Sequence, residues 1–560
     1  MNREAVKHRL TPEYVFPVNN DDIVIRLKTG KDVEEVKICY GDPWDPEGFK
    51  TKVMEKSYPV ADGRIFETTV TPPYKRLCYE FIFEEDGEKL YYLEEGFMSE
   101  KKHDSIYRRL QRFFFPWLNP VDVITTPEWT ADTVWYQIFP DRFFKDNDKP
   151  GFEKWDAKPQ GLYDMFGGTL SGISKKLDYL KELGVTGIYL NPINESTTNH
   201  RYDTVDYEKI DPILGNEQDM KELVDRAHEA GMKVMIDGVF NHSSDKWAPW
   251  QDVLEKRKAS KYYDWFMIED EDFDVKEGPR KGQYYTFGFE SYMPKLNTGN
   301  PELQDYLIGV MKHWVTDWGV DGIRFDVGNE VSHDFLKKTH RELKAIDPEL
   351  YLVGELWHDS LPWLEGDEYD AVMNYPLMNA VCDFLKLEDE SGNALVEELN
   401  RLRLLYPDQV NRTNFNLLDS HDTDRIRYRM ETMDKTKQAL AMLMSLPGSI
   451  SLYYGTELYM DGGPDPDCRR CMEWQKADTP EGREMFEFMR KLISLRKLLN
   501  SDDYELSHDG RLIGIHRPDA DVWINAESSK KPIAAAGEVL LAANYDGIQL
   551  APGGILICAK

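Results

Sequence analysis

The stretch LQDYLIGVMKHWVTDWGVDGIRFDV, Leu303–Val327, combines an amphipathic helix, a glycine and a short apolar strand. Gly319 stands where the helical pattern stops, and glycine in that place is typical of a helix C-terminus. After Val320 and Asp321, the segment from Gly322 is apolar except for Arg324 and Asp326. A helix that leads directly into a buried strand is half of a β/α repeat, so the stretch predicts a parallel α/β sheet.

The same unit recurs along the middle of the chain. It is found in SGISKKLDYLKELGVTGIYLNP, Ser171–Pro192, and in DMKELVDRAHEAGMKVMIDGVFNH, Asp219–His242, where Gly184 and Gly231 mark the breaks. The strands are continuously apolar, which is typical of parallel strands buried on both faces. About eight strands can be placed, and that number fits a (β/α)8 TIM barrel better than a doubly wound sheet. We expect them to begin near Trp135, Ile188, Val234, Ile323, Leu352, Val372, Phe415 and Ser451.

Three further regions differ in pattern from this barrel, which we place at residues 126–494. Residues 1–125 hold short runs such as DIVIRLK and RIFETTV between turn residues, and they predict an N-terminal β-sandwich. Residues 243–300 are too long for a βα loop and rich in aromatic side chains, so we expect an inserted subdomain after the third strand. Residues 495–560 include pieces such as RLIGIHR and predict a small C-terminal β-domain.

Composition and charge exclude several classes of partner. The 560 residues carry 69 basic and 101 acidic side chains, a net charge of −32. A surface of this sign repels nucleic acid and anionic membranes, so we expect neither as a partner, whereas a neutral sugar is not disfavoured. The first residues, MNREAVKHRL, lack the apolar segment of a secretion signal, and no apolar run approaches the about 18 residues of a membrane span. We therefore expect a cytoplasmic protein.

The cysteines agree with that location. They are too sparse for a disulfide framework in a chain of this length. The motif Cys468-Arg-Arg-Cys471 has the spacing of a redox or metal pair, but a zinc site needs two further ligands at suitable spacing. We expect free thiols at all six positions, which are Cys39, Cys78, Cys382, Cys468, Cys471 and Cys558.

Acidic residues follow four of the predicted strands at their C-terminal ends, where TIM barrels place their active sites. Asp237 follows the third strand, Asp326 the fourth, Glu355 the fifth and Asp422 the seventh. Any one of them could cap a helix or pair locally. Four carboxylates gathered at one rim by chance are improbable, because unpaired buried charge is costly. The rim is therefore the expected active site.

Two of these carboxylates have the environments that glycoside hydrolysis requires, in which one is ionised and the other protonated. In a strand, residues i and i+2 share a face, so we expect Arg324 beside Asp326, with Val327 on the opposite face. A neighbouring guanidinium group lowers the pKa of Asp326, whereas burial on an apolar strand beside Trp357 raises the pKa of Glu355. Taken alone, Arg324 and Asp326 fit a structural ion pair equally well.

Several motifs surround these carboxylates: VWYQIFPDRF (Val134–Phe143), FGGTLSGI (Phe166–Ile173), DGVFNH (Asp237–His242), MPKLN (Met293–Asn297), GIRFDVGNEVSH (Gly322–His333), GELWH (Gly354–His358), LLDSHDTDR (Leu417–Arg425), YYGTE (Tyr453–Glu457) and GGPDPDCRRCMEW (Gly462–Trp474). Together they resemble the α-amylase family of glycoside hydrolases, and within it the neopullulanase, cyclomaltodextrinase and maltogenic amylase group. The resemblance is strong from about residue 130 to about residue 475. MPKLN and the NEVSH ending point to the members that act on cyclomaltodextrins.

The resemblance implies a retaining double displacement. In such a reaction Asp326 is the nucleophile, Glu355 is the general acid/base, and Asp422 holds sugar hydroxyls in the transition state. Arg324 positions the nucleophile. The resemblance also implies a set of substrate-binding residues around the bond that is cleaved: His242 and His421 on one glucose unit, Tyr202 stacked on it with His200 nearby, Asp237 at a strand end, Glu330, Trp357 and Phe287 on the acceptor side, and Asp465 and Arg469 on the donor side.

The chain departs from the family at its calcium site. Many members bind calcium through Asn and Asp residues after the first strand and through the Asp of FGGDL. Here the loop FFKDNDKPGF, Phe143–Phe152, is short, and Thr169 occupies the Asp position. Calcium takes six to eight oxygen ligands, several of them carboxylates. We therefore expect no metal and no cofactor. Asp419 and Asp424 are also unusual neighbours of the SHDT motif, and the sequence assigns them no role.

The implied function is hydrolysis of α-1,4-glucosidic bonds in cyclodextrins and maltooligosaccharides, and by extension in pullulan or starch. The alternatives are an α-glucosidase or oligo-1,6-glucosidase of the same fold and a non-catalytic sugar-binding member. The last class loses the carboxylates that this chain keeps. In the group, the N-terminal domain often covers the active site of a partner subunit, so a homodimer is expected besides the α-glucan oligosaccharide substrate.

Overall fold

The computed structural model describes residues 1–103, 112–146 and 150–560 of the chain. The middle of the chain forms a parallel sheet in the order β18-β17-β16-β15-β12-β11-β20-β19. A parallel bridge between Met373 and Phe415 joins the two ends of that order and closes the sheet. The TIM barrel is therefore confirmed, and each strand contains the residue at which it was expected. The barrel strands are β11 (Val134–Ile138), β12 (Gly187–Leu190), β15 (Lys233–Gly238), β16 (Gly322–Phe325), β17 (Tyr351–Gly354), β18 (Ala371–Val372), β19 (Phe415–Asn416) and β20 (Ser449–Tyr453).

One β/α repeat shows how the sequence builds the barrel. Helix α8 (Pro301–His313) begins after Asn300, whose side chain accepts two backbone N–H groups of the first turn. A π-helical turn over Trp314–Trp318 continues it to Gly319, where φ is 79°, a left-handed value that glycine adopts without strain. The next strand, β16, is buried along its whole length. The chain therefore turns at the glycine and enters the barrel directly.

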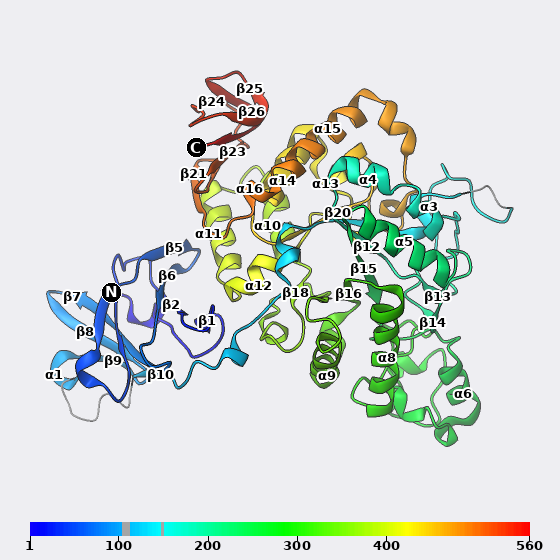
Figure 1. Ribbon diagram of the computed structural model, residues 1–560, viewed down its shortest axis with the longest axis horizontal. Coiled ribbons are helices and arrows are strands. Elements are labelled where there is room, and N and C mark those ends of the chain that lie inside the picture. Colours follow the sequence, from blue (N-terminus) through cyan, green and yellow to red (C-terminus); the bar gives the residue numbers. More distant parts are fainter. Residues whose placement is uncertain (104–111, 147–149) are drawn as a thin grey trace. The chain divides into compact units, whose positions relative to one another are not determined.

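The helices of the barrel lie around the outside of the closed sheet (Figure 1). Each turns an apolar stripe inward; in α5 the stripe is formed by Met220, Leu223, Val224 and Ala227. A short antiparallel pair, β13 (Asn194–Ser196) and β14 (Thr204–Ile210), follows β12. The helices are α2 (Pro140–Phe143), α3 (Leu170–Ser174), α4 (Leu177–Leu183), α5 (Glu217–Glu229), α8, α9 (His333–Lys344), α10 (Tyr375–Lys386), α13 (Ile426–Met430), α14 (Met433–Met444), α15 (Pro480–Ser494) and α16 (Arg496–Leu499).

The segment between β15 and α8 is the expected insertion. It holds α6 (Ala248–Lys256) and α7 (Gly278–Lys281), joined by long irregular stretches. Its aromatic side chains form a small core of their own, in which Trp250 packs against Phe266 at a ring-centroid distance of 4.7 Å and against Phe273 at 5.6 Å. Burial of such rings gives the insertion a fixed shape beside the strand ends.

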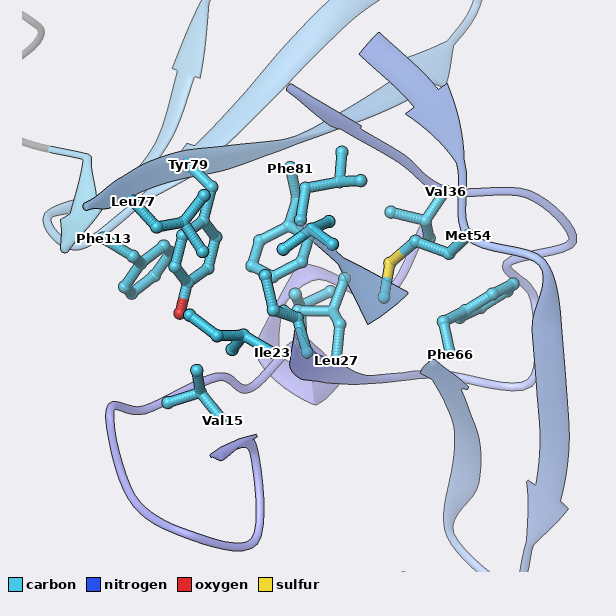
Figure 2. Packing of buried hydrophobic residues seen from close by; sticks show 14 of the residues in the cluster. Val15, Ile23, Leu27, Val36, Met54, Phe66, Leu77, Tyr79, Phe81 and Phe113 are labelled. Carbon is cyan, nitrogen blue, oxygen red and sulfur yellow. The ribbon is translucent and has the colours of Figure 1, made fainter. Parts of the chain in front are cut away.

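The N-terminal residues form the expected β-sandwich. One sheet has the order β1-β2-β6-β5 and the other β4-β3-β7-β8-β9, with β10 paired to β7. Figure 2 shows its core, where Leu77, Tyr79 and Phe113 lie together on one side and Met54 and Phe66 on the other. The strands are β1 (Val15–Pro17), β2 (Ile23–Thr29), β3 (Lys37–Gly41), β4 (Lys50–Val53), β5 (Lys56–Val60), β6 (Gly63–Val70), β7 (Leu77–Glu85), β8 (Glu88–Leu93), β9 (Gly96–Ser99) and β10 (Phe113–Phe115). A short helix, α1 (Glu100–His103), lies between β9 and β10 in the chain.

The sandwich belongs to a compact unit that is discontinuous in sequence. The unit comprises Met1–Thr126, Leu364–Gly366 and Glu390–Asn411, and the rest of the chain forms a second unit. Helix α11 (Gly392–Arg403), which follows α10 in the chain, is thus part of the N-terminal unit. Asn400 of α11 donates a side-chain hydrogen bond to the carbonyl oxygen of Pro59 at 3.0 Å. Helix α12 (Asp408–Thr413) begins in the same unit.

The C-terminal residues form an antiparallel sheet in the order β21-β22-β23-β26-β24, with β25 paired to β26. Its strands are β21 (Glu505–Asp509), β22 (Leu512–His516), β23 (Ala520–Asn525), β24 (Lys531–Pro532), β25 (Val539–Tyr545) and β26 (Gln549–Ala559). Among the described residues, no helix combines the length and the apolar composition that crossing a bilayer requires.

Candidate active site

A cavity of about 430 Å³ lies at the C-terminal ends of the barrel strands. It brings together side chains from the loops that follow seven of the barrel strands. Most of the predicted site residues are on its wall, including Asp326, Glu355 and Asp422. The lining residues are Leu162, His200, Tyr202, His242, Phe287, Glu290, Tyr292, Met293, Asp326, Val327, Asn329, Glu355, Trp357, Asp422, Asp465 and Arg469.

Arg324 holds three carboxylates beneath the floor of this cavity. Its Nη1 donates to Asp237 Oδ1 at 2.9 Å and to Asp326 Oδ1 at 3.1 Å. Its Nη2 lies 3.0 Å from Glu355 Oε2. Arg324 and Asp237 are buried and are not among the residues that line the cavity. Arg324 and Asp326 are neighbours, as expected, and Glu355 also contacts Arg324.

The expected lowering of the Asp326 pKa is wrong for the free protein. Burial raises the pKa of Asp326 well above its ordinary value, the negative charge of Glu355 raises it further, and Arg324 only opposes these effects. One guanidinium group cannot compensate three carboxylates in a place from which water is largely excluded. In the free protein Asp326 therefore holds its proton more tightly than an exposed aspartate does, because its pKa is raised.

Val327 also differs from expectation. Strand β16 ends at Phe325, and Val327 adopts a left-handed conformation with φ 46° and ψ 45°. Such values are rare for a β-branched residue. The turn brings Val327 onto the cavity wall instead of the opposite face, and it aims the Val327 N–H at Glu355 Oε2, 2.9 Å away. The strained turn thus helps to fix the position of Glu355.

Glu355 is held at both of its oxygens. Oε2 accepts the Val327 N–H and forms an ion pair with Arg324, and the indole Nε1–H of Trp357 donates to Oε1 at 3.1 Å. The Trp357 ring stacks on Tyr375 with a centroid distance of 3.5 Å and an interplanar angle of 7°. Half of Trp357 remains exposed at the cavity mouth. A planar, exposed indole in this place can stack on a sugar ring.

Asp422 is fixed by two neighbours on the other side of the cavity. Arg469 Nη2 donates to Asp422 Oδ1 at 3.0 Å, and its Nη1 lies 3.2 Å from Asp465 Oδ1. His421 Nε2 lies 3.0 Å from Asp422 Oδ2. Asp422 is more exposed than the other two carboxylates of the expected triad and faces the cavity. Its oxygens are available to sugar hydroxyl groups.

His421 supports the wall of the cavity and is not part of it. Its side chain is fully buried, and its Nδ1 accepts from Gln137 Nε2 at 2.8 Å. The proton is therefore assigned to Nε2, which is 2.7 Å from the hydroxyl oxygen of Tyr202. Burial, together with the charges of Arg469 and Arg324, lowers the pKa of His421, so the ring is neutral. Protein groups lie within hydrogen-bond distance of both ring nitrogens, and the binding of glucose by His421 stays a prediction.

His242 does present a free polar atom to the cavity. Its Nε2 is buried and has no hydrogen-bond partner in the described part of the chain. Its ring stacks on Phe287, which is 40% exposed, at a centroid distance of 5.0 Å. Burial lowers the pKa of His242 to about 3 and that of His200 to about 4, so both are neutral near pH 7. A buried nitrogen without a partner is costly, and a substrate hydroxyl group would satisfy it.

Glu330 lies beside the cavity. Its carboxylate pairs with Lys295 Nζ at 3.0 Å, and the same ammonium group also donates to the side-chain oxygen of Asn241. Asn329, one residue earlier, lines the cavity, as do Asp326 and Val327 of the same loop. Lys295 belongs to MPKLN, so that motif ties the insertion to the loop after β16.

Several lining residues carry no motif that sequence reasoning could use. Leu162 stands in the long loop after β11, and Glu290, Tyr292 and Met293 belong to the insertion. Tyr292 directly precedes MPKLN, which is the signal that could have drawn attention to it. Leu162 offers no such signal, because a lone leucine in a loop resembles any surface residue.

At the place where the family binds calcium, Asp146 is contacted by protein side chains. Asp146 Oδ1 lies 2.5 Å from Lys175 Nζ, and Thr169 donates to Asp146 Oδ2 at 3.0 Å. An ammonium group thus neutralises the carboxylate, and Thr169 adds no charge. Asn147 and Asp148, which belong to the loop FFKDNDKPGF, lie outside the described residues.

The contacts of Asp419 and of the cysteines Cys468 and Cys471 are those of structural residues. Asp419 is buried and accepts the backbone N–H of Ile426 at 2.8 Å, at the start of α13. Asp424 follows on the same loop. Cys468 donates to the carbonyl oxygen of His421 at 3.3 Å, and burial raises its pKa to about 12. Cys471 is buried too, and a buried neutral thiol is a poor nucleophile and metal ligand.

Comparison with known proteins places the chain among enzymes of one kind. The family described as "Alpha amylase, catalytic domain" matches residues 137–497, and "Alpha amylase, N-terminal ig-like domain" matches residues 1–116. The "Maltogenic alpha-amylase" of Bacillus acidopullulyticus is 43% identical over 524 residues, which cover 91% of this chain and 87% of that protein. The "Intracellular maltogenic amylase" of Bacillus subtilis is 38% identical over 513 residues, covering 90% and 85%. A solved structure of a "Cyclomaltodextrinase" superposes with a TM-score of 0.92 at 36% identity over all of both chains.

Proposed function

The chain belongs to the α-amylase family of glycoside hydrolases, and we propose that it hydrolyses α-1,4-glucosidic bonds of cyclodextrins and maltooligosaccharides with retention of configuration. The observation that carries the proposal is the Arg324 guanidinium group, which contacts both Asp326 and Glu355 on the cavity wall. Two carboxyl groups on one guanidinium group are close together. Retaining glycosidases need carboxyl groups about 5–5.5 Å apart, whereas inverting enzymes need a wider gap for water.

In the first step Asp326 attacks the anomeric carbon, the glycosidic C–O bond breaks, and Glu355 gives its proton to the leaving oxygen. The product of this step is a covalent glycosyl–enzyme ester. The step needs a proton on Glu355 and a negative charge on Asp326. Positive charge that develops on the sugar favours that arrangement, because it stabilises the ionised nucleophile next to it.

In the second step a water molecule attacks the same carbon, the ester bond breaks, and Glu355 takes the proton from water. Asp326 leaves as a carboxylate, and the configuration is retained. Asp422 accepts hydrogen bonds from hydroxyl groups of the reacting glucose unit, and His242 Nε2 pairs with another. Arg469 and His421 hold Asp422 so that its oxygens do not need to reorganise during the reaction.

The experiment that tests this function compares three substrates. Purified protein is incubated with β-cyclodextrin, soluble starch and pullulan, reducing ends are followed, and Asp326→Asn is the blank. Fast release from the cyclodextrin and slow release from starch is the expected result. Starch cleaved as fast as the ring would mean an open cleft. Release from small linear or α-1,6-linked oligosaccharides only would favour the α-glucosidase alternative, and no release above the blank on any substrate would overturn the proposal.

We propose that the enzyme works without calcium. The pairing of Asp146 with Lys175 supports this, because an ammonium group supplies the positive charge that a cation would bring. Thr169 in the place of a carboxylate removes a charged ligand that calcium favours. Among the described residues, no cluster of three or more His, Cys, Asp or Glu side chains is arranged to hold a metal ion.

We propose that the protein is a homodimer and that the N-terminal unit provides the contact. Exposed apolar side chains on this unit support the proposal: Trp44 is 74% exposed, Val121 91% and Tyr74 55%. Trp44 also lines a hollow of about 230 Å³ together with Pro43, Arg76, Leu77 and Phe114–Pro116. Exposed apolar side chains around a hollow are typical of protein–protein contacts. The resemblance to a group whose N-terminal domains cover a partner's active site favours a second copy as the occupant.

Light scattering at micromolar concentration tests the dimer. We expect twice the chain mass for the wild type and a shift to monomer for Trp44→Ala. Two chains of net charge −32 repel each other, so the dimer fraction is expected to rise with salt. A monomer at every salt concentration would contradict the proposal.

We propose a cytoplasmic location. The six cysteines are free, which suits a reducing compartment. A relative bears the name "Intracellular maltogenic amylase", which supports the same location. Cell fractionation with a periplasmic marker as the control tests it, and recovery with that marker would contradict it.

A further inference from the structure

Gln137 is a buried polar residue of the first barrel strand whose side chain reaches the catalytic rim. It lies in β11 and is not among the residues that line the cavity. Its amide Nε2 donates to His421 Nδ1 at 2.8 Å and to Asn191 Oδ1 at 3.2 Å. Its amide oxygen is buried and has no hydrogen-bond partner in the described part of the chain. An unpaired buried acceptor is costly, so the orientation of this amide group calls for a reason.

The reason lies on the other side of the His421 ring. Its Nε2 faces two oxygen atoms, the hydroxyl oxygen of Tyr202 at 2.7 Å and Oδ2 of Asp422 at 3.0 Å. A carboxylate oxygen beside a ring nitrogen favours a proton on that nitrogen. The neutral ring then carries a lone pair on Nδ1, which needs a donor. Reversal of the Gln137 amide would set its oxygen against that lone pair and against Asn191 Oδ1, so the amide keeps its nitrogen on this side.

The proton on Nε2 also sets the direction of a chain of hydrogen bonds. Because His421 donates to the Tyr202 oxygen, the hydroxyl proton of Tyr202 is available to Asp237 Oδ2, 2.7 Å away. Asp237 is held in turn by Arg324, whose Nη1 also donates to Asp326. All donors in the chain therefore point the same way, toward the guanidinium group that contacts the nucleophile. Hydrogen bonds aligned in this manner strengthen one another.

The other tautomer of His421 would disturb the site at two points. With the proton on Nδ1, Tyr202 would have to donate to His421 Nε2, and Asp237 would lose a donor. The lone pair on Nε2 would also face Asp422 Oδ2 at 3.0 Å, and the two would repel each other. In the proposed reaction Asp422 accepts sugar hydroxyl groups, so a shift of this carboxylate would weaken its hold on the transition state.

We propose that Gln137 is a positioning residue that fixes the tautomer of His421 and, through it, the contacts that hold Asp422 and Asp237 during glycoside hydrolysis. The inference rests on the proposed function, because both carboxylates belong to the same site. Among the described residues, the Gln137 side chain forms hydrogen bonds with His421 and Asn191, and with no carboxylate. Gln137 therefore acts on the reaction through the imidazole ring.

The tautomer is tested by nitrogen NMR of wild-type protein labelled with 15N-histidine, which distinguishes protonated from unprotonated ring nitrogens. We expect His421 to be protonated at Nε2 and not at Nδ1, with its signals assigned by their loss in His421→Asn. A proton on Nδ1 in the wild type would overturn the proposal. This measurement needs neither a variant of Gln137 that folds nor turnover of substrate.

The effect on catalysis is tested by a double-mutant cycle of Gln137→Met and Tyr202→Phe, with kcat and KM measured on β-cyclodextrin. Methionine is similar in size to glutamine but cannot donate. Phenylalanine keeps the stack on His421 and removes the hydroxyl group. Loss of one hydrogen bond should lower kcat of Gln137→Met by about threefold to tenfold with little change in KM. Because both changes break one chain, the double variant should keep at least about threefold more activity than the product of the single effects.

Gln438→Met is the matched control. Gln438 is buried like Gln137, and its Nε2 also donates to two oxygen atoms, but these are carbonyl oxygens of Asn525 and Gly554 in the C-terminal sheet. Its effect on kcat should be small and should simply multiply with that of Tyr202→Phe, since the two sites share no partner.

The outcomes separate the two proposals. If the wild type is active and Gln137→Met has an unchanged kcat, or if its effect multiplies with that of Tyr202→Phe, the positioning role is refuted and the proposed function stands. If the wild type releases nothing above the Asp326→Asn blank, the proposed function is refuted and the catalytic role of Gln137 with it, while the NMR measurement still decides the tautomer.

Discussion

The indole N–H of Trp357 donates to Glu355 Oε1 while the ring stacks on Tyr375. One side chain thus touches the expected general acid/base, and its exposed face is offered to the acceptor sugar. Trp357→Phe keeps a ring on Tyr375 but loses the hydrogen bond. Because a hydrogen bond to a charged group contributes about 1.5–3 kcal/mol, we expect kcat on β-cyclodextrin to fall about tenfold or more with little change in KM.

Trp357→Ala provides the contrast. It removes the stacking face as well, so KM should rise in addition to the fall in kcat. Steady-state kinetics of both variants on one substrate preparation measure the split. Equal kinetic parameters for wild type and Trp357→Phe would show that the hydrogen bond does not position Glu355.

Asp326→Asn should make the protein more stable while abolishing activity. Burial raises the pKa of Asp326, so its ionised form destabilises the fold. Asn has the same shape, can still accept from Arg324 and carries no charge. Each unit of pKa shift corresponds to about 1.4 kcal/mol. We therefore expect a gain of roughly 1 kcal/mol or more at pH 7, measured as a higher Tm.

The sign of this effect depends on pH in a defined way. A carboxyl group whose folded pKa is raised contributes fully to stability below its ordinary pKa of 3.8, and that contribution is lost as pH rises through the folded pKa. The Tm of Asp326→Asn should therefore exceed that of the wild type by more at pH 7 than at pH 4.5. A gap that narrows as pH rises would contradict a raised pKa.

His242 should make the protein sensitive to acid. Its ordinary pKa is 6.5 and its folded pKa is about 3, so the unfolded chain binds more protons between these values. Stability is then lost as pH falls below about 6.5, by up to roughly 1.4 kcal/mol per pH unit. His242→Gln removes this term, so its Tm should fall less steeply between pH 6.5 and pH 4.5. Above pH 7 the two proteins should differ by a constant amount, and equal slopes on the acid side would refute the assignment.

Calcium removal should leave the enzyme unchanged. The pair of Asp146 and Lys175 already neutralises the loop charge, so chelation with EDTA removes nothing that the fold needs. We expect the same Tm and the same rate on β-cyclodextrin before and after chelation, with a calcium-dependent amylase as the positive control. A loss of both that calcium restores, and magnesium does not, would contradict the prediction.

The sequence predicted the barrel because its strands are apolar and because three repeats, around Gly184, Gly231 and Gly319, join an amphipathic helix to a buried strand through a glycine. In the repeat around Gly319 the structure has the helix, the glycine and the strand where the sequence pattern predicts them. It also predicted which strand ends carry Asp326, Glu355 and Asp422, since the C-terminal ends of parallel strands meet at one rim. These are properties of single segments and of their order.

The electrostatics and the far wall of the site could not be predicted in this way. The pKa of Asp326 depends on how many carboxylates share Arg324, which is a three-body relationship among β15, β16 and β17. The ring of His421 is held by a hydrogen bond with Gln137 of β11, a strand separated from β19 by β20 alone. Val327 leaves the strand pattern through one left-handed residue. Leu162 lines the cavity, and hydrogen bonds of Asn199 and Arg142 hold its loop there.

Because the N-terminal unit is discontinuous in sequence, it limits where this protein can be divided to make chimeras with its relatives. Residues Glu390–Asn411 are encoded within the barrel gene segment but fold with Met1–Thr126, and Arg26 of the sandwich pairs with Asp408 at 2.6 Å. A chimera in which only the first 126 residues were exchanged would have to pack the sandwich of a relative against α11 of this protein. The exchangeable module is therefore the pair of segments, and a chimera that carries both is expected to express better than one that carries the first alone.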